Sequence, residues 1–359
     1  MSKIKAGVIG CGAIANQKHL PSALKTDLVD FVGFCDIVEE RAEKTSKEFG
    51  TKFAKHYTDY KKLLEDKSIE VVYVCTPNRS HSEISVAALE SGKHVMCEKP
   101  MAINTAEAEK MVNAAKKSGK LLTIGYQNRY ALEYQFAKKY SDEGGFGDIY
   151  FARAKAVRRR AVPTWGVFLN EYEQGGGPLI DIGTHALDLT LWTMNNYKPK
   201  YVVGTVYHKL NNQTNTGNIF GEWNPAEFTV EDSAFGFVVM ENGATIVLES
   251  SWALNDRFPQ ESTFTLSGTK AGIDFVDGAY INHIQGGRQA VTEVNMDTGG
   301  VAFIDGNASG KPEDIEQSVF LNAVLGKGTL TVTPEQAFVV TQILEGIYES
   351  AKIGQPVYF

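Results

Sequence analysis

The stretch "VIGCGAIA", residues 8–15, decides how the amino-terminal part of the chain folds. It continues an apolar run that begins at Lys3 and has the form G-x-G-x-x-A, with Gly10, Gly12 and Ala15 at the defining positions. Between a strand and a helix, the first glycine permits a tight turn, the second lets a pyrophosphate approach the backbone, and the small third residue permits close helix packing. The N-terminus of the helix then faces the anion. An isolated copy of the pattern also fits an ordinary turn between a strand and a helix. The surrounding sequence therefore decides whether the turn is predicted to bind a pyrophosphate.

Strand-like and helical patterns alternate along the chain up to residue 125. Short apolar runs are separated by helical patterns, and these runs occupy residues 3–10, 29–36, 52–57, 70–78, 93–100 and 120–127. This order predicts an α/β fold in residues 1–125, with a doubly wound parallel sheet of the Rossmann type. In that setting the glycine-rich turn predicts a dinucleotide site formed by Gly10, Gly12, Ala13, Ile14 and Ala15.

The pattern changes after residue 126. A helix is expected at about 130–140, and longer strand-like runs follow at residues 148–157, 201–210, 228–240, 243–254 and 261–268. Asn242-Gly243, between two of these runs, is the dipeptide typical of a tight hairpin. Residues 126–359 are therefore predicted to form a second α/β domain with a large, mostly antiparallel open sheet. The polar segment 211–227 is expected to be a loop that acts as a lid or contacts another subunit.

The composition argues against several classes of protein. The formal charge of −7 leaves no basic footprint, so nucleic acid is not expected as a partner. No apolar run reaches the roughly 18 residues that a membrane span needs, and the first strand begins too early for a signal peptide. The four cysteines form no CxxC pair and suit buried thiols in a reducing interior. We therefore expect a cytoplasmic protein with no membrane contact.

The end of the second strand indicates which dinucleotide binds. Asp36 stands 24 residues after Gly12, where a carboxylate accepts hydrogen bonds from the adenosine ribose. A carboxylate there repels a 2′-phosphate, which favours NAD over NADP. Arg41, one turn further, could reach a phosphate or stack on adenine. The alternative role for Asp36 is an N-cap of the following helix.

Polar residues also follow three further predicted strands, as the segments Thr76-Pro77-Asn78, Glu98-Lys99-Pro100 and Tyr126-Gln127-Asn128-Arg129. In a doubly wound sheet, ligands bind outside the carboxyl ends of the strands, so these residues are candidates for ligand contacts. Pro100 keeps Lys99 out of the helical conformation. A lysine beside a positively charged nicotinamide would have a lowered pKa and could help a substrate hydroxyl lose its proton. The alternative is an ordinary surface lysine.

A later apolar helix, predicted at residues 179–194, carries Asp181, His185 and Asp188 on one face. The unperturbed pKa of histidine suits proton transfer near neutrality, so His185 is a candidate general acid/base, and Asp181 one turn earlier could orient it. The pair could equally form a structural hydrogen bond within a core. A metal site would need more ligands than the sequence offers nearby, so no metal is predicted.

Substrate contacts are expected from "VRRRAVPTWG", residues 157–166. Of the three adjacent arginines Arg158–Arg160, we expect Arg158 to recognise a carboxylate, phosphate or sulfate by a bidentate contact, although a solvated strand end is the alternative. Trp165 could stack on a sugar ring, or it could pack in a core or an interface. Arg129, at the expected domain junction, is a further candidate for substrate binding.

Four motifs give the chain a resemblance to a known family, namely "GCGAIA", "CTPNRSH", "CEKPMA" and "GGGPLIDIGTHALDL". In their order and spacing the chain resembles the glucose–fructose oxidoreductase / inositol dehydrogenase / MocA (Gfo/Idh/MocA) family. The resemblance implies that Lys99 binds the reacting hydroxyl, that His185 is the general acid/base, and that Asp181 orients the substrate and the histidine. It also implies cofactor contacts from Thr76, Asn78, His81 and Glu98.

The resemblance implies an NAD-dependent oxidoreductase that acts on a secondary hydroxyl of a sugar, polyol or glycoside. An NAD-dependent glycosidase, which would oxidise a ring hydroxyl transiently, eliminate the aglycone and add water, is the alternative that uses the same residues. A cofactor-binding regulator without turnover is disfavoured by the intact set Lys99, Asp181 and His185. A small carbohydrate is the expected partner, and a homodimer or homotetramer through the sheet of the second domain is the expected assembly.

Overall fold

The computed structural model describes residues 3–296 and 310–359, and the chain divides into two compact units. The first unit combines the described parts of residues 1–130 and 306–338, and the second combines those of residues 131–305 and 339–359. This division differs from the single boundary at residue 125 expected from the sequence. The reason is helix α10 (Pro312–Val324), whose Phe320 and Leu321 are buried in the core of the first unit.

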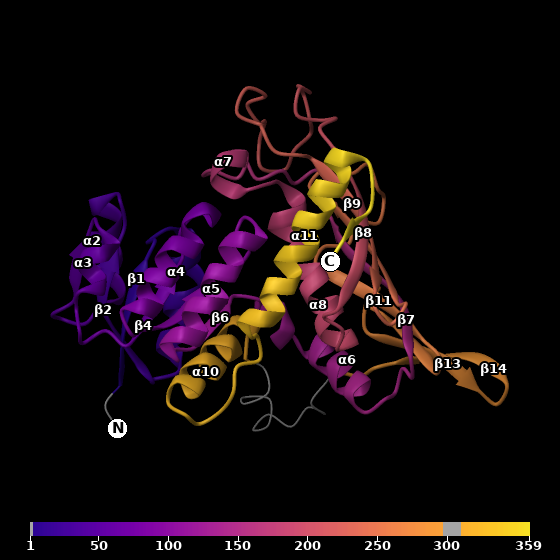
Figure 1. The fold of residues 1–359 in the computed structure, drawn as a ribbon, viewed down its shortest axis with the longest axis horizontal. Coiled ribbons are helices and arrows are strands. Elements are labelled where there is room, and N and C mark those ends of the chain that lie inside the picture. The colour runs from indigo at the N-terminus through magenta and orange to yellow at the C-terminus, as the bar shows by residue number, and fades with distance from the viewer. Residues whose placement is uncertain (1–2, 297–309) are drawn as a thin grey trace. The chain divides into compact units, whose positions relative to one another are not determined.

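The first unit is built on a six-stranded parallel sheet in the order β3-β2-β1-β4-β5-β6, which confirms the predicted doubly wound fold. Its strands are β1 (Ile4–Ile9), β2 (Val29–Cys35), β3 (Lys55–Tyr57), β4 (Val71–Val74), β5 (His94–Cys97) and β6 (Leu122–Ile124). Its helices besides α10 are η1 (Ala15–His19), α1 (Leu20–Lys25), α2 (Glu39–Phe49), α3 (Tyr60–Leu64), η2 (Asn78–Ser80), α4 (His81–Glu90), α5 (Thr105–Ser118) and η3 (Gln127–Tyr130). In Figure 1 these elements run from indigo to magenta, and α10, in gold, packs beside α1.

The second unit is built on a nine-stranded sheet in the order β14-β13-β12-β11-β7-β10-β9-β8-β15 (Figure 1). Only β7 and β10 pair in parallel among the described strands of this sheet, so the prediction of a mostly antiparallel open sheet is confirmed. The strands are β7 (Ile149–Val157), β8 (Pro199–Tyr207), β9 (Ser233–Met240), β10 (Thr245–Ser251), β11 (Thr263–Gly268), β12 (Ala271–Asp274), β13 (Tyr280–Gln285), β14 (Arg288–Glu293) and β15 (Val357–Tyr358).

Two details of this sheet bear on the sequence analysis. Asn242-Gly243 does form the hairpin between β9 and β10, and Gly243 adopts a φ of 88° that favours glycine. Strands β12, β13 and β14 were not expected, because their residues do not form an apolar run. Most side chains of β13 and β14 are exposed or half-buried, so no buried face imposes a strong alternation on their sequence.

The helices of the second unit are α6 (Leu132–Asp142), α7 (Glu171–Gln174), η4 (Leu179–Gly183), α8 (Thr184–Met194) and α11 (Pro334–Ile353), the last of which contains the division between the units. Of these, η4, α8 and α11 pack on one face of the second sheet. Every residue of α8 is buried, and this helix packs against β7, β11 and α6. The predicted helix at 179–194 is therefore present, with its first turn wound as a π-helix in η4.

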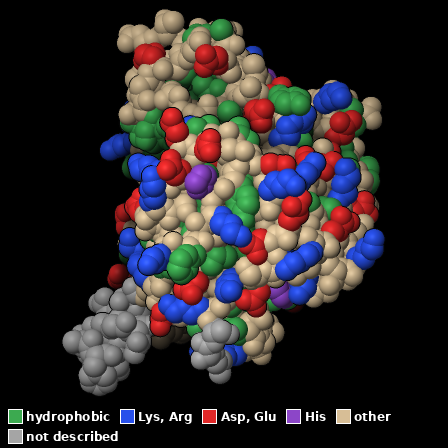
Figure 2. All heavy atoms as spheres, turned by 90° about the vertical axis from the view of Figure 1, so that its left-hand side faces the viewer, with side chains coloured by type: hydrophobic (Ala, Val, Ile, Leu, Met, Phe, Trp, Pro, Cys, Tyr) green, Lys and Arg blue, Asp and Glu red, His purple; other side chains and the backbone are tan. Residues whose placement is uncertain are grey.

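The surface mixes charges of both signs. On the face shown in Figure 2, lysine and arginine side chains are interspersed with aspartate and glutamate. None of the helices within the described ranges is long and apolar enough to cross a bilayer. Four buried free thiols are found in the described chain, as the sequence predicts, at Cys11, Cys35, Cys75 and Cys97.

Candidate active site

The glycine-rich turn has the geometry that its sequence predicts. Gly10 has a φ of 93°, and a Cβ atom there would lie 2.4 Å from the Cys75 carbonyl oxygen, so only glycine fits. A Cβ at Gly12 would instead meet nothing within 4 Å, which leaves the backbone open on that side. Ala13 and Ile14 are exposed beside it, while Ala15 is fully buried against the sheet. An open backbone at the start of a helix is the shape that a pyrophosphate requires.

Asp36 lies directly beside this turn. Its Oδ2 accepts a hydrogen bond from the Cys11 amide at 2.9 Å, and its Oδ1 accepts one from the Val38 amide at 2.9 Å. Val38 occupies the N-cap position of α2, so the alternative role of Asp36 as the N-cap is wrong. The role of Asp36 as the ribose acceptor stays a prediction, and Arg41 lies exposed in the first turn of α2.

His81 joins two of the polar strand ends. Its Nδ1 lies 2.8 Å from the Pro100 carbonyl oxygen and its Nε2 lies 2.9 Å from the Thr76 carbonyl oxygen. The imidazole has no exposed surface, and burial lowers its pKa. The ring therefore joins the two loops that carry Thr76 and Pro100, and its contact with a cofactor stays a prediction. Thr76 Oγ1 is buried and has no hydrogen-bond partner among the described residues, while Asn78 and Asn128 are half-buried at the same strand ends.

Glu98 is likewise a buried support. Its Oε1 accepts hydrogen bonds from Lys18 Nζ at 2.7 Å and contacts His19 Nε2 at 2.6 Å, and its Oε2 accepts the Lys99 amide at 3.0 Å. Burial would raise the pKa of Glu98, but the Lys18 ammonium and the bond to His19 hold it well below its usual value. Both oxygens of the Glu98 carboxylate thus have protein partners, and its contact with the cofactor stays a prediction. Lys99 itself is half-buried in a bend, as the following proline predicts.

Helix α10 completes this cluster from the far end of the sequence. Gln317 Nε2 lies 3.0 Å from His19 Nδ1, and Glu316 Oε2 lies 3.4 Å from Lys18 Nζ. Burial raises the pKa of Glu316 to about 7, with Lys18 opposing the shift and Glu98 adding to it. No sequence signal identified Lys18, His19 or Glu316, because the cluster forms only when α10 packs on the sheet.

We expect Glu316→Gln to change how thermal stability depends on pH. The folded-state pKa of Glu316 lies above its ordinary value of 4.5, so its contribution to stability is complete below that value and is lost as pH rises through about 7. The melting temperature of the native protein should therefore fall relative to that of the variant between about pH 5 and about pH 8. Calorimetry of both proteins across this range measures the difference.

The experiment must account for the titration of His19 and needs a control variant. Burial and Lys18 lower the pKa of His19, so the contribution of His19 to stability is lost as pH falls. This contribution is common to the native protein and Glu316→Gln, and it therefore cancels when their melting temperatures are compared. Glu109→Gln, at an exposed position on α5, is the control and should leave the pH dependence unchanged. If the melting temperatures of the native protein and Glu316→Gln change with pH in the same way, Glu316 does not titrate in this range.

Asp181 and His185 lie at the start of the buried helix in the second unit. Asp181 belongs to η4 and His185 to α8, and both side chains are at least nine-tenths buried. Asp181 Oδ2 accepts a hydrogen bond from Trp252 Nε1 at 3.0 Å. Trp252 was missed in the sequence because it follows β10, 71 residues further on. Asp188 is fully enclosed within α8, which agrees with a structural role.

The expected substrate arginines are engaged with protein groups. Arg158 forms a bidentate pair with Glu261, with Nε–Oε2 at 2.8 Å and Nη2–Oε1 at 2.6 Å. Arg129 Nη1 donates to the Thr331 carbonyl oxygen at 2.8 Å, and its side chain has no exposed surface. Both guanidinium groups therefore have protein partners, and their roles in substrate binding stay predictions.

Trp165 remains available for a substrate contact, because half of its surface is exposed. Its ring packs edge-on against Phe220 with centroids 4.8 Å apart. Phe220 belongs to the polar segment 211–227, which is irregular as predicted. Asn218 joins this segment to the strand end by accepting from the Val162 amide at 2.8 Å.

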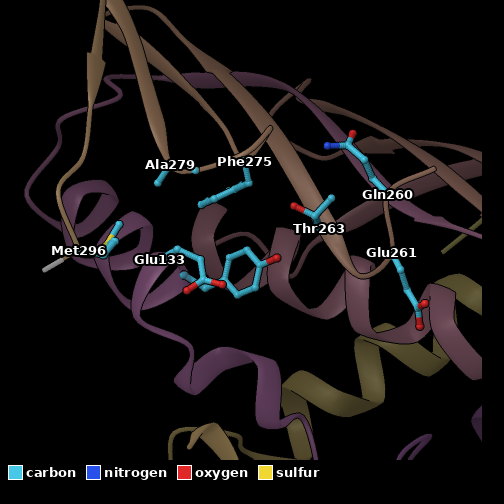
Figure 3. Close-up of a pocket in the computed structure, with 9 residues that line it drawn as sticks. Glu133, Gln260, Glu261, Thr263, Phe275, Ala279 and Met296 are labelled. Carbon is cyan, nitrogen blue, oxygen red and sulfur yellow. The ribbon is translucent and has the colours of Figure 1, made fainter. Parts of the chain in front are cut away.

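A pocket of about 400 Å³ opens elsewhere in the second unit, between α6 and the start of β11 (Figure 3). Its lining residues are Glu133, Tyr134, Gln260, Glu261, Thr263, Phe275, Gly278, Ala279 and Met296. Asp181, His185 and Trp165 do not line it. The described part of the chain also holds no group of three or more His, Cys, Asp or Glu residues placed to bind a metal ion.

Comparisons with known proteins agree with these features. Residues 4–126 match the model of an oxidoreductase family with an NAD-binding Rossmann fold, and residues 134–274 match the model of the GFO/IDH/MocA C-terminal domain. D-glucoside 3-dehydrogenase of Escherichia coli strain K12 is 34% identical over 356 residues, which cover 99% of this chain and 97% of that protein. Inositol 2-dehydrogenase of Salmonella typhimurium strain LT2 is 33% identical over 197 residues, or 54% of this chain and 56% of that protein.

Solved structures share the fold along the whole chain. Levoglucosan dehydrogenase in complex with NADH and L-sorbose superposes with a TM-score of 0.84 at 22% identity, covering 100% of this chain and 99% of that one. An aldose-aldose oxidoreductase from Caulobacter crescentus, complexed with glycerol, superposes with a TM-score of 0.79 at 22% identity and covers 100% of both chains.

Proposed function

Because the chain belongs to the GFO/IDH/MocA family of NAD-binding oxidoreductases, we propose that it oxidises a secondary hydroxyl of a sugar, polyol or glycoside. The observation that carries this proposal is the similarity, along nearly the full length, to a D-glucoside 3-dehydrogenase. The buried helix that presents Asp181 and His185 supports it, since a dehydrogenase needs a proton acceptor that is held in place. A glucoside with free ring hydroxyls is therefore the first substrate to test.

The residues divide the reaction between them. In the proposed mechanism, Lys99 hydrogen-bonds the reacting hydroxyl, and its positive charge stabilises the oxygen as the proton leaves. His185 accepts that proton, and Asp181 orients the substrate and the imidazole. Trp165 provides an aromatic surface for the sugar ring. When bound, NAD would supply the hydride acceptor. Loss of a hydride from the carbon that carries the reacting hydroxyl would convert the alcohol to a carbonyl group.

The cofactor preference gives a direct prediction. Asp36→Ala should reduce the preference for NAD over NADP by about tenfold or more, because a charge-assisted hydrogen bond to the ribose is lost and repulsion of a 2′-phosphate is removed. The ratio of kcat/KM with the two cofactors measures the change, and NADH and NADPH affinities measure it without substrate. An unchanged ratio would exclude Asp36 from ribose recognition.

Two further variants make the result specific. Asp36→Asn keeps one acceptor oxygen, which can serve the Cys11 amide or the Val38 amide but not both, so it removes the charge with less disturbance of the turn than alanine does. Asp30→Ala, on the same strand, should leave the preference unchanged.

We also propose that the protein forms a homodimer or homotetramer through the uncovered face of the second sheet. Val203, Phe237 and Val247 are neighbours across β8, β9 and β10 on this face. Phe237 is almost half exposed, and an adjacent pair of aromatic rings, Tyr207 and Phe235, extends the apolar surface. Light scattering gives the number of subunits.

The unbridged thiols suit a reducing compartment, and we propose the cytoplasm.

A single screen tests the reaction. Sugars, polyols and aryl glucosides are incubated with NAD, and NADH absorbance and released aglycone are recorded in the same wells. NADH formation without aglycone release supports the dehydrogenase proposal. Aglycone release that requires NAD but accumulates no NADH would replace it with the redox-assisted glycosidase, and no turnover with any of these substrates would contradict both.

A further inference from the structure

A buried carboxylate lies under the start of the helix that carries Asp181 and His185. Glu231 precedes β9 and is only 2% exposed. Its Oε2 accepts the Gly177 amide at 2.7 Å, and its Oε1 accepts the Leu179 amide at 3.1 Å. The first amides of a helix have no partner within the helix, and a negative charge at this end is favourable. Glu231 therefore supplies acceptors to the first turn of η4.

A second residue holds Glu231 in this position. Tyr348, on α11, donates its hydroxyl hydrogen to Glu231 Oε1 at 2.8 Å. Burial raises the pKa values of both groups, while the amides of Gly177 and Leu179 and the Tyr348 hydroxyl favour the ionised carboxylate. The carboxylate thus links α11 to the start of η4 through three hydrogen bonds.

Two glycines before the helix lie directly against Tyr348 and the backbone of Glu231. A Cβ at Gly176 would lie 2.1 Å from the Tyr348 hydroxyl oxygen, and a Cβ at Gly177 would lie 2.3 Å from the Glu231 carbonyl oxygen. Neither position accepts a larger residue without displacing Tyr348 or Glu231. Gly176 and Gly177 of the "GGGP" at residues 175–178, which the catalytic roles do not explain, are therefore needed for this close packing.

Other contacts fix the same segment along its length. Ser250 Oγ donates to the Pro178 carbonyl oxygen at 2.7 Å, and Trp252 Nε1 donates to Asp181 Oδ2 at 3.0 Å. With Glu231 at its first turn, η4 is held at its start and at Asp181. A shift of the start of η4 would therefore carry Asp181 and His185 with it.

We propose that Glu231 and Tyr348 are positioning residues that set the placement of Asp181 and His185. The catalytic part of this inference rests on the proposed function. The positioning part does not, because the state of the His185 imidazole can be observed without turnover. Neither residue contacts the reacting groups in this proposal, and both act through the backbone of η4.

The test compares Glu231→Gln with the native protein by two independent measurements. The first is the ¹⁵N and ¹H spectrum of the His185 ring during a pH titration, assigned with a His185→Ala sample. We expect a shifted titration midpoint or tautomer balance in Glu231→Gln. The second is steady-state kinetics, in which we expect kcat to fall by about tenfold with KM nearly unchanged, since a displaced base affects the transition state more than ground-state binding.

A matched control and a milder variant keep the test decisive. Glu227→Gln, an exposed glutamate of the same loop, should match the native protein in both measurements. Tyr348→Phe removes only the hydroxyl bond and should change both in the same direction by a smaller amount, so it replaces Glu231→Gln if that variant does not fold. An unchanged His185 titration in a folded variant would overturn the proposal. If the substrate screen shows no turnover, the His185 spectrum alone decides the positioning proposal.

Discussion

Replacing His185 with alanine should lower kcat for sugar oxidation by at least about 10²-fold, the usual contribution of a positioned general base. The loss follows because no other group in the proposed mechanism accepts the hydroxyl proton. The binding of NAD should remain, since the glycine-rich turn and Asp36 belong to the first unit and His185 belongs to the second. Steady-state kinetics together with NADH affinity separates the two effects.

The pH dependence of the reaction makes this result specific. In the native protein kcat should rise with pH as the imidazole loses its proton, and in His185→Ala this limb should disappear. His283→Ala, on β13 of the same unit, is the control and should leave both kcat and its pH profile intact. Normal turnover by His185→Ala would remove His185 from the mechanism.

Lys99→Ala should lower kcat/KM by about 10²-fold, comparable to the loss of one donor that stabilises a developing oxyanion. Glu98 accepts the backbone amide of Lys99, and this bond does not depend on the lysine side chain. We therefore expect the fold and the Lys18–Glu98 pair to persist, and the loss to come from the missing ammonium group. Kinetics with the substrate identified by the screen provides the measurement.

Restoration by added amines distinguishes a missing ammonium group from a damaged site. Small alkylammonium ions should recover part of the activity of Lys99→Ala, and they should not affect the native protein. Lys117→Ala, an exposed lysine of α5, should behave like the native protein. Full activity of Lys99→Ala would refute the proposed role of the "EKP" lysine.

The sequence predicts those parts of the fold that have a local pattern of buried and exposed residues. The first unit alternates buried strands with helices, and Gly10 and Gly12 mark the turn that begins the series, so the parallel sheet follows from the sequence. Strands β13 and β14 form an exposed extension of the second sheet, and their sequence has no buried face to reveal them. The placement of α10 depends on Phe320 and Leu321 packing into a core formed hundreds of residues earlier, which no local pattern specifies.

The candidate site likewise contains residues that the sequence predicts and residues that it does not. Lys99, Asp181 and His185 could be named because each stands in a recognisable motif. Their supports could not, since Trp252, Glu231 and Glu316 approach from segments far away in the sequence. Arg158 shows a further limit of sequence patterns, because a run of arginines indicates positive charge but does not reveal the ion pair with Glu261.

The return of α10 to the first unit also determines when that unit can be completed during synthesis. Phe320 packs edge-on against Tyr73, with ring centroids 6.1 Å apart, in the core that also contains Phe31. A ribosome delivers the strands of this sheet first and α10 only after almost all of the second unit. The nascent Rossmann domain therefore keeps an apolar face uncovered while about 180 further residues are made, the interval in which partly folded chains associate most readily and in which chaperones protect them.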